Sequence, residues 1–298
     1  MSPGTRALLQ MHFCVALWGF TAILGKLITL HALPLVWWRM LLVTGALLLV
    51  RRFWSGVLEM GARLLAVFAG IGVLLSLHWV TFYAAIKLAN ASVAATCMAL
   101  TPVVIALLEP AIARRRFDPR ELLFGVAVIP GVLLVVGGTP EGMRWGVLMG
   151  AASAVLIGVV SCLNKRFVER ANALSVTGIE MAAGVVFLPL LAAFLPSGEV
   201  VLEWPSRHDI LLLLTLAFAC TLLPFALSLV ALRHLSAFSA ALVVNLEPVY
   251  AIVLAMLLFR EQRELGLSFY AGGAILLGAV FAHPLTRRAK LAPANVTA

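Results

Sequence analysis

The chain has 298 residues, of which 63% are hydrophobic and only 12% are charged, and its mean hydropathy is +1.07. Soluble domains average about 45–50% apolar and about 25% charged residues. This composition excludes an ordinary soluble globule and predicts an integral membrane protein, while the formal net charge of +9 leaves a nucleic-acid partner to be considered.

Ten apolar stretches follow one another along the chain, most of them about 18–23 residues long, the length of helix that crosses about 30 Å of hydrocarbon. Helices are expected because lipid offers the backbone no hydrogen-bond partners. Short loops join the stretches and leave no room for a soluble domain. The predicted spans are residues 9–29, 34–50, 64–86, 91–113, 121–138, 145–164, 173–195, 210–232, 236–258 and 266–283.

The two halves of the sequence repeat each other. The segment KLANAS at residues 87–92, followed by LTPV at 100–103, returns as RHLSAF at 233–238, followed by LEPV at 246–249. Both pairs of segments are separated by a constant offset of 146 residues. Two further traces, with offsets of 141 and 147 residues, connect the same halves.

Each half contains five predicted spans, an odd number, so the second half must lie upside down relative to the first. We therefore predict an all-α fold of ten transmembrane helices in two inverted five-helix repeats, residues 9–138 and 145–284, followed by a cytoplasmic tail at 285–298. Secondary transporters use inverted repeats to build a central site that opens alternately to either side of the membrane.

Lysine and arginine are distributed unequally between the two predicted sides of the membrane. With the N-terminus inside, 15 of the 22 fall in inner segments and five in outer loops, while Lys26 and Arg39 lie within spans. The positive-inside rule then places both termini in the cytoplasm of a multi-pass protein of the cell inner membrane. Topology and contact with membrane lipids account for the basic excess, so no nucleic-acid partner is expected.

Charged residues inside spans are the first functional candidates, because burial near the bilayer centre costs at least about 2.5–3.5 kcal/mol on insertion scales. Arg39 lies in the outer half of the second span, and its repeat counterpart Glu180 lies in the inner half of the seventh. Two interpretations stay open: the charges line the translocation pathway, or they form structural pairs and clamps. Their heights differ by roughly 10 Å, so no direct contact between them is expected.

Glu247 lies near the middle of the ninth span, directly before Pro248. Proline removes a backbone donor and frees carbonyl groups in the preceding turn. A carboxyl beside such a break is a candidate for binding substrate or a proton, and otherwise a hydrogen-bonding strut between helices. Thr101, before Pro102 in the fourth span, supplies the matching kink without the charge.

Aromatic and polar neighbours complete the candidate pathway. His78 is either a neutral core histidine or part of a proton relay beside Trp79 and Tyr83. Trp18 and Tyr250 are candidates for lining a cavity, although single aromatic residues more often serve packing. The predicted pathway residues are Trp18, Arg39, His78, Trp79, Tyr83, Thr101, Glu180, Asn245, Glu247 and Tyr250, and the proton-coupling candidates among them are Glu247, His78 and Glu180.

Signatures of enzymatic chemistry are missing from the sequence. It contains no H-E-x-x-H, G-x-S-x-G, G-x-G-x-x-G or Walker motif. Its only aspartates, Asp118 and Asp209, are assigned to loops, and its four cysteines show no C-x-x-C spacing. We therefore expect no catalytic residues, no metal and no cofactor.

Segments of both halves carry a shared pattern: Trp18-Gly19, Arg39, LHWVTFYAAIKLA at 77–89, Thr101-Pro102 and LLEP at 107–110 in the first half, with ALRHLSA at 231–237, NLEPVY at 245–250 and FRE at 259–261 in the second. Together these segments resemble the EamA domains of the drug/metabolite transporter superfamily. The resemblance implies an inner-membrane carrier with two inverted five-helix halves around a central cavity. Members move amino acids, other metabolites, nucleotide sugars or drugs, commonly as exporters.

The sequence as a whole predicts a secondary transporter that exports a small metabolite, an amino acid or a related compound, by alternating access with proton coupling. An uncoupled facilitator or a drug-efflux carrier is the nearest alternative, and an intramembrane lipid or isoprenoid enzyme a remote one. The expected partners are the small-molecule substrate and membrane lipids, with the protein a monomer or a homodimer.

Overall fold

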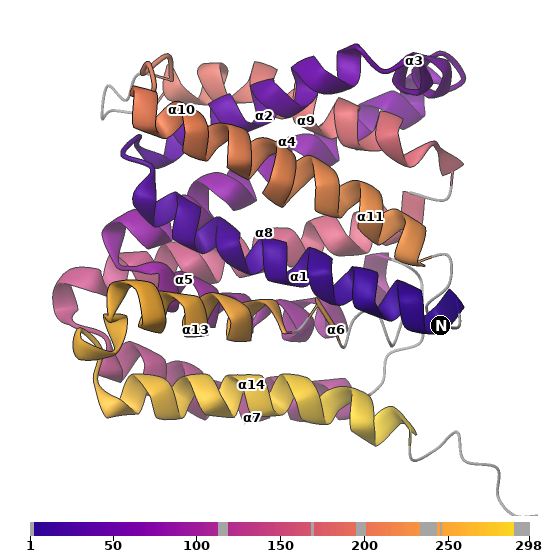
Figure 1. Ribbon diagram of the computed structural model, residues 1–298. Helices are drawn as coiled ribbons and strands as arrows, with labels where there is room; N and C mark the ends of the chain where they lie inside the picture. The colour runs from indigo at the N-terminus through magenta and orange to yellow at the C-terminus, as the bar shows by residue number, and fades with distance from the viewer. Residues whose placement is uncertain are drawn as a thin grey trace, which may run out of the picture.

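The computed structural model describes residues 3–112, 119–167, 170–194, 201–232, 243–244 and 246–288, and all regular structure in these ranges is helical. The helices lie side by side in one elongated bundle (Figure 1). The main helices are α1 (Pro3–Leu27), α2 (Ala32–Leu48), α3 (Arg51–Leu58), α4 (Ala62–Leu88), α5 (Ala91–Met98), α6 (Thr101–Ile112), α7 (Pro119–Gly138), α8 (Arg144–Phe167), α9 (Ala173–Ala192), α10 (Arg207–Leu214), α11 (Leu223–Leu232), α13 (Glu247–Phe259) and α14 (Leu267–Arg288). A π-helix, η3 (Thr215–Leu222), connects α10 to α11, and the short 3-10 helices η1 (Glu141–Met143) and η4 (Glu261–Arg263) precede α8 and follow α13.

The prediction of an all-α membrane protein is confirmed. Among the described residues, five helices are long and apolar enough to cross a membrane, and the bent pairs α2–α3 and α5–α6 raise the number to as many as seven. The shorter apolar helices Ile129–Gly138, Glu247–Phe259 and Leu267–Ala279 occupy the predicted fifth, ninth and tenth spans. The full count of ten spans stays a prediction.

Large apolar side chains cover much of the outside of the bundle. Leu133, Leu211 and Leu257 are exposed over 67%, 68% and 74% of their surface. A soluble monomer rarely exposes such extensive apolar surface, whereas a lipid-facing surface requires it.

Helix α3 occupies a stretch between the second and third spans that the sequence analysis treats as a connection. It turns 88° away from α2. Arg51, Arg52 and an exposed Trp54 lie in its first turn, a composition that suits the membrane interface. The Trp54 indole nitrogen donates to the Leu48 carbonyl at 2.8 Å, which satisfies a group at the end of α2 that has no partner within the helix.

Packing between the halves is symmetric. Helix α1, first in its half, packs against η3 and α11 of the other half, just as α8, first in the second half, packs against α4. The equivalent helices α2 and α9 pack together, as do α7 and α14, which form the outermost pair in Figure 1. This pairing is what an approximate twofold axis through the middle of the bundle produces.

The two halves run in opposite directions. Helix α1 leads from the N-terminus to the opposite end of the bundle, on the left in Figure 1, which we call the far end. Helix α8 begins at that far end, where Gly146 packs against the backbone of Ala89. The small-residue face of α8 continues along the bundle, with Gly150 against Cys97 and Gly158 against Val104. These glycines therefore serve packing between helices of one bundle.

Candidate translocation site

Arg39, on α2, is buried in the middle of the bundle with 3% of its surface exposed. Its Nε donates to the Thr221 hydroxyl at 2.7 Å, and its Nη1 donates to the Tyr83 hydroxyl at 3.0 Å. The guanidinium carbon lies 3.8 Å from the centre of the Trp79 ring, a cation–π contact. Two of its five N–H groups are thereby used, and no described residue accepts from the other three.

Thr221 reaches Arg39 because η3 is a π-helix. The wider turn lets the Thr221 hydroxyl donate to the Leu216 carbonyl five residues earlier, at 2.7 Å, while it accepts from Arg39. Short π-helical segments inside α-helices occur frequently at functional sites. Thr221 is not among the residues that the sequence predicts for the pathway, because no simple sequence pattern indicates this local widening of the helix.

A small pocket near the centre of the bundle is lined by both halves of the chain, and Glu247 in its wall is within electrostatic range of Arg39, which does not itself line the pocket. Its volume, about 10 Å³, is close to the minimum that holds one water molecule, so the centre of the bundle is almost closed. The walls are mostly apolar, and Glu247 is the only acidic residue among the described residues that form them. The lining residues are Trp18, Thr21, Ala22, Phe82, Ala95, Met98, Glu247, Pro248 and Ala251.

Glu247 and Arg39 place opposite charges around this centre without a direct ion pair between them in the described structure. Glu247 is the first residue of α13 and is followed by Pro248, and its carboxyl lies within electrostatic range of the Arg39 guanidinium. No described residue donates a hydrogen bond to that carboxyl. A carboxylate at a helix N-terminus is favoured by the helix dipole.

Several polar atoms near the centre have no hydrogen-bond partner in the described structure. They include the Trp18 indole nitrogen and the Thr101 hydroxyl, and Trp18 lines the pocket. Buried polar groups are nearly always paired, so atoms left without a partner call for a ligand or water. Thr101 begins α6 after the bend from α5, at the position that the repeat relates to Glu247 at the start of α13.

His78 is joined to α8 rather than to the pocket. Its Nδ1 lies 2.8 Å from the Ser153 hydroxyl and 3.0 Å from the Ser153 carbonyl. The same hydroxyl donates to the His78 carbonyl at 2.9 Å, and a carbonyl can only accept. This geometry assigns the proton to Nδ1 and fits a structural link between α4 and α8.

Glu180 of α9 lies apart from Arg39 and forms a separate buried polar pair with Asn164 of α8. It has 2% of its surface exposed, and its backbone packs against Gly72 of α4. Its side chain interacts with Asn164 of α8, yet its Oε1 atom and the Asn164 Oδ1 atom have no partner in the described structure. Arg39 is not among the groups that influence Glu180 electrostatically.

Tyr250, the last aromatic candidate, packs against α1. A Cβ added to Gly19 would lie 2.9 Å from the Tyr250 Cβ, so the two helices meet closely at this level. Tyr250 belongs to an apolar cluster with Trp18 and Met11 and does not line the pocket. Asn245 lies outside the described residues.

The two halves, their opposite directions and a central pocket between them describe a carrier architecture, and comparison with known families agrees. The model of the EamA-like transporter family matches residues 5–137 and again residues 144–282. The chain belongs to the EamA-like transporter family. The two matches are two copies of one domain, so this EamA protein is a membrane transporter built from a duplicated unit.

A solved structure supports the same fold. The structure titled "Crystal structure of protein" superposes with a TM-score of 0.60 over 95% of this chain and 99% of that chain, at 20% sequence identity. At this identity the likeness extends to the fold alone. No curated protein gives a significant match.

Proposed function

We propose that this EamA protein is an inner-membrane secondary transporter that exports a small metabolite, an amino acid or a related compound, by alternating access of its two halves. The observation that carries the proposal is a small pocket lined by both halves, with Glu247 in its wall and the buried Arg39 within electrostatic range of that carboxyl. A substrate with a negative and a positive group would satisfy both charges, and the apolar walls would take its carbon skeleton.

Both halves belong to a single chain, so a monomer is the simplest working unit, and a homodimer would contain two such units. The far end of the bundle faces the outside in this proposal, because the positive-inside rule favours cytoplasmic termini.

The transport proposal is tested by flux through the purified protein. Proteoliposomes preloaded with each of the twenty common amino acids, one at a time, are assayed for exchange with the radiolabelled compound. Exchange of one or a few amino acids above the level of empty liposomes is expected. Exchange of none, combined with metabolite profiles that do not differ between cells with and without the gene, would refute amino-acid export.

Proton coupling is assigned to Glu247, the acidic residue in the pocket wall. The Glu247→Gln variant keeps the shape of the side chain but cannot take up and release a proton. We expect both modes to lose the charged contact with the substrate's positive group, and transport driven by a pH gradient to fall at least about tenfold further than exchange at equal pH on both sides. Measuring both modes in the same proteoliposomes checks this, and normal pH-driven flux in Glu247→Gln would remove Glu247 from the coupling mechanism.

The mostly apolar pocket wall also favours a second candidate, an uncoupled carrier for hydrophobic drugs or toxic compounds. A protonophore separates the two possibilities. It abolishes the concentrating ability of a proton-coupled carrier, whereas an uncoupled carrier only equilibrates its substrate, with or without the protonophore.

A further inference from the structure

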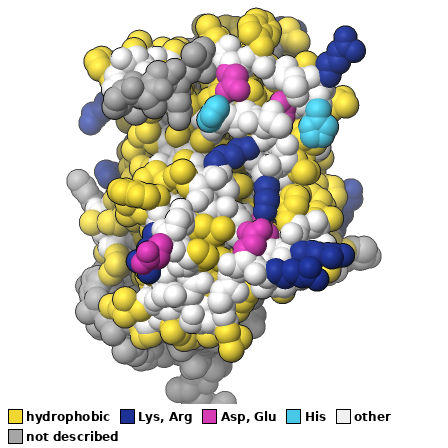
Figure 2. Space-filling view, turned by 90° about the vertical axis from the view of Figure 1, so that its left-hand side faces the viewer, with side chains coloured by type: hydrophobic (Ala, Val, Ile, Leu, Met, Phe, Trp, Pro, Cys, Tyr) yellow, Lys and Arg dark blue, Asp and Glu magenta, His cyan; other side chains and the backbone are white. Residues whose placement is uncertain are grey.

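The far end of the bundle is closed by polar contacts that cross from one half to the other. Figure 2 looks onto this end, where acidic, basic and histidine side chains lie across a surface bordered by hydrophobic ones. Two buried acids of the second half, Glu261 and Asp209, make most of these contacts. Each carboxylate accepts hydrogen bonds from backbone or side-chain groups of the first half.

Glu261, in η4 between α13 and α14, is completely buried. Its Oε1 accepts from the Lys26 ammonium of α1 at 2.8 Å and from the Ala91 amide at 3.2 Å, and its Oε2 accepts from the Ser92 amide at 2.7 Å. These two amides belong to the first turn of α5, where a helix leaves its N–H groups without partners. One carboxylate therefore joins α1 and α5 of the first half to the second half.

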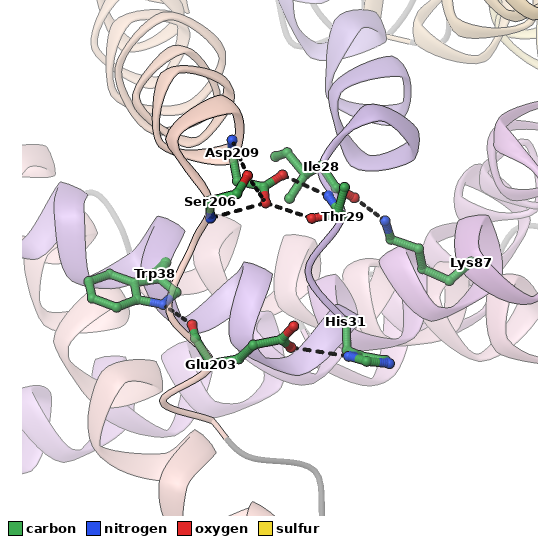
Figure 3. Close-up of polar contacts among 8 residues, drawn as sticks. All are labelled: Ile28, Thr29, His31, Trp38, Lys87, Glu203, Ser206 and Asp209. Carbon is green, nitrogen blue, oxygen red and sulfur yellow. Dashed lines mark hydrogen bonds and ion pairs between the residues drawn. The ribbon is translucent and has the colours of Figure 1, made fainter.

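Asp209, in the first turn of α10, makes the second joint (Figure 3). It is buried, and its Oδ1 accepts from the Thr29 amide at 2.7 Å. Its Oδ2 accepts from the Thr29 hydroxyl at 2.6 Å and from the Ser206 hydroxyl at 2.7 Å. The link between α1 and α2 is thus fastened to α10, although the sequence analysis assigned Asp209 only to a loop.

Two further contacts reinforce the same end. The Asn90 side chain donates to Glu264 at 3.0 Å, which again crosses between the halves. The Lys87 ammonium donates to the Ile28 carbonyl and keeps α4 against the end of α1 (Figure 3). The end of α1 is therefore held by Glu261, by Asp209 and by α4.

The sequence does not repeat these acids in the first half. At the offset of 146 residues, Glu261 corresponds to Arg115 and Asp209 to Arg63. An inverted repeat would bring equivalent joints to the opposite end of the bundle, but at these two positions that half carries arginine instead of a carboxylate. The repeat therefore does not duplicate the Glu261 and Asp209 joints at the opposite end.

We propose that Glu261 and Asp209 form the outer gate of the transporter and hold the pocket shut from the outside until their contacts with the first half break. This inference rests on the proposed transport function. Charge-assisted hydrogen bonds with buried carboxylates are among the strongest polar contacts in proteins, so their number and burial stabilise the state closed at the far end. Opening at that end requires α1 and α5 to separate from the α13–α14 link and from α10.

Accessibility of the pocket from each side tests the gate without knowledge of the substrate. Ala95, in the pocket wall on α5, is replaced by cysteine in a protein whose four native cysteines are alanine. A membrane-impermeant methanethiosulfonate reagent is then applied to right-side-out and to inside-out vesicles. The variants Glu261→Gln and Asp209→Asn are compared with Glu141→Gln, an exposed acid at the same end whose only described ion pair is with Arg144.

We expect Glu261→Gln and Asp209→Asn to speed labelling from the outside at least about tenfold and to leave labelling from the inside unchanged or slower. Glu141→Gln should label like the parent protein. If either gate variant does not fold, the other decides, together with Lys26→Met, which removes a single contact of Glu261 and should give a smaller increase.

Unchanged labelling from the outside in the gate variants would overturn the proposal. Equal acceleration from both sides would overturn it too, because the acids would then stabilise the fold rather than close one end. Flux of the parent protein, measured separately, shows whether the proposed transport function stands, so failure of the gate and failure of the function remain distinguishable.

Discussion

The centre and the far end of this bundle both contain buried charged side chains, but these side chains differ in how many hydrogen-bond partners the protein gives them. At the far end, each oxygen of Glu261 and Asp209 accepts at least one hydrogen bond from a protein group. At the centre, Arg39 keeps three N–H groups for which no described residue is an acceptor, and no described group donates to the Glu247 carboxyl.

In the function proposed above, this difference separates polar groups that hold helices together from polar groups that bind the substrate. A satisfied buried network specifies one arrangement of the helices around it. A buried polar group without a partner is destabilising unless something outside the chain completes it, and in the described structure the Trp18 indole N–H at the pocket is such a group. The comparison thus predicts that changes at the centre affect transport more than stability, whereas changes at sites of tight packing affect stability more than transport.

The largest effect is expected from Arg39→Gln. This change removes the positive charge while leaving an amide that can still donate to Tyr83 or Thr221. A hydrogen bond to a charged group contributes about 1.5–3 kcal/mol, so loss of the charged contact with substrate should lower exchange flux by up to roughly 100-fold. Exchange in proteoliposomes, normalised to the amount of folded protein, measures it.

Arg144→Gln is the matched control, because Arg144 is an exposed cation at the far end that pairs with Glu141 at 3.3 Å. Its flux should equal that of the parent protein, since exposed ion pairs contribute little. Full flux in Arg39→Gln would show instead that Arg39 is only a structural clamp between α2, α4 and η3.

The sequence predicted the central charges for a physical reason that needs no structure. Arg39 and Glu247 stand out because a charge within an apolar span requires a compensating role, and the proline after Glu247 marks the break of a helix. Repeat offsets likewise predicted the two halves. These signals are local in the chain or depend on comparing it with itself.

The far end could not be predicted in the same way. The sequence marks Glu261 only as part of a family pattern and Asp209 only as a loop residue, because their partners in the first half lie 169 to 235 residues away along the chain. Thr221 was missed because a π-helix changes which side of the span a residue faces without any mark in composition. Contacts of this kind depend on how the halves dock, which periodicity alone does not specify.

A moderate effect on stability is expected at the α7–α14 pair, away from both regions. A Cβ at Gly272 would lie 2.7 Å from the Val135 nitrogen and 2.9 Å from the Leu134 Cβ, so Gly272→Ala should force the helices apart and destabilise the protein by about 1–3 kcal/mol. Thermal unfolding in detergent measures this. Flux per folded molecule should change little, because neither charge of the centre moves.

The neighbouring glycine provides the control for that change. A Cβ at Gly273 would meet only the Thr96 side chain, at an ordinary 3.5 Å, so Gly273→Ala should alter stability by less than about 1 kcal/mol. Equal destabilisation by the two alanines would mean that the α7–α14 contact at Gly272 is no tighter than the surroundings of Gly273. A large loss of flux per folded molecule in Gly272→Ala would break the separation between packing and transport.

The smallest effect is expected from two tryptophans, one at the centre and one in a well-packed site, and it tests the difference between these two kinds of site most directly. Trp18 lines the pocket with an indole N–H that has no partner in the described structure, whereas the indole N–H of Trp37 donates to the Val185 carbonyl at 3.0 Å. A hydrogen bond contributes about 0.5–1.5 kcal/mol, so Trp18→Phe should raise the half-saturation concentration for exchange about two- to tenfold with little change in stability. Trp37→Phe should lower stability by a similar free energy and leave half-saturation unchanged. If both variants lowered stability and neither changed half-saturation, the Trp18 indole would serve only the packing of α1 against α11 and α13. Its unpaired N–H would then not be a contact with the substrate.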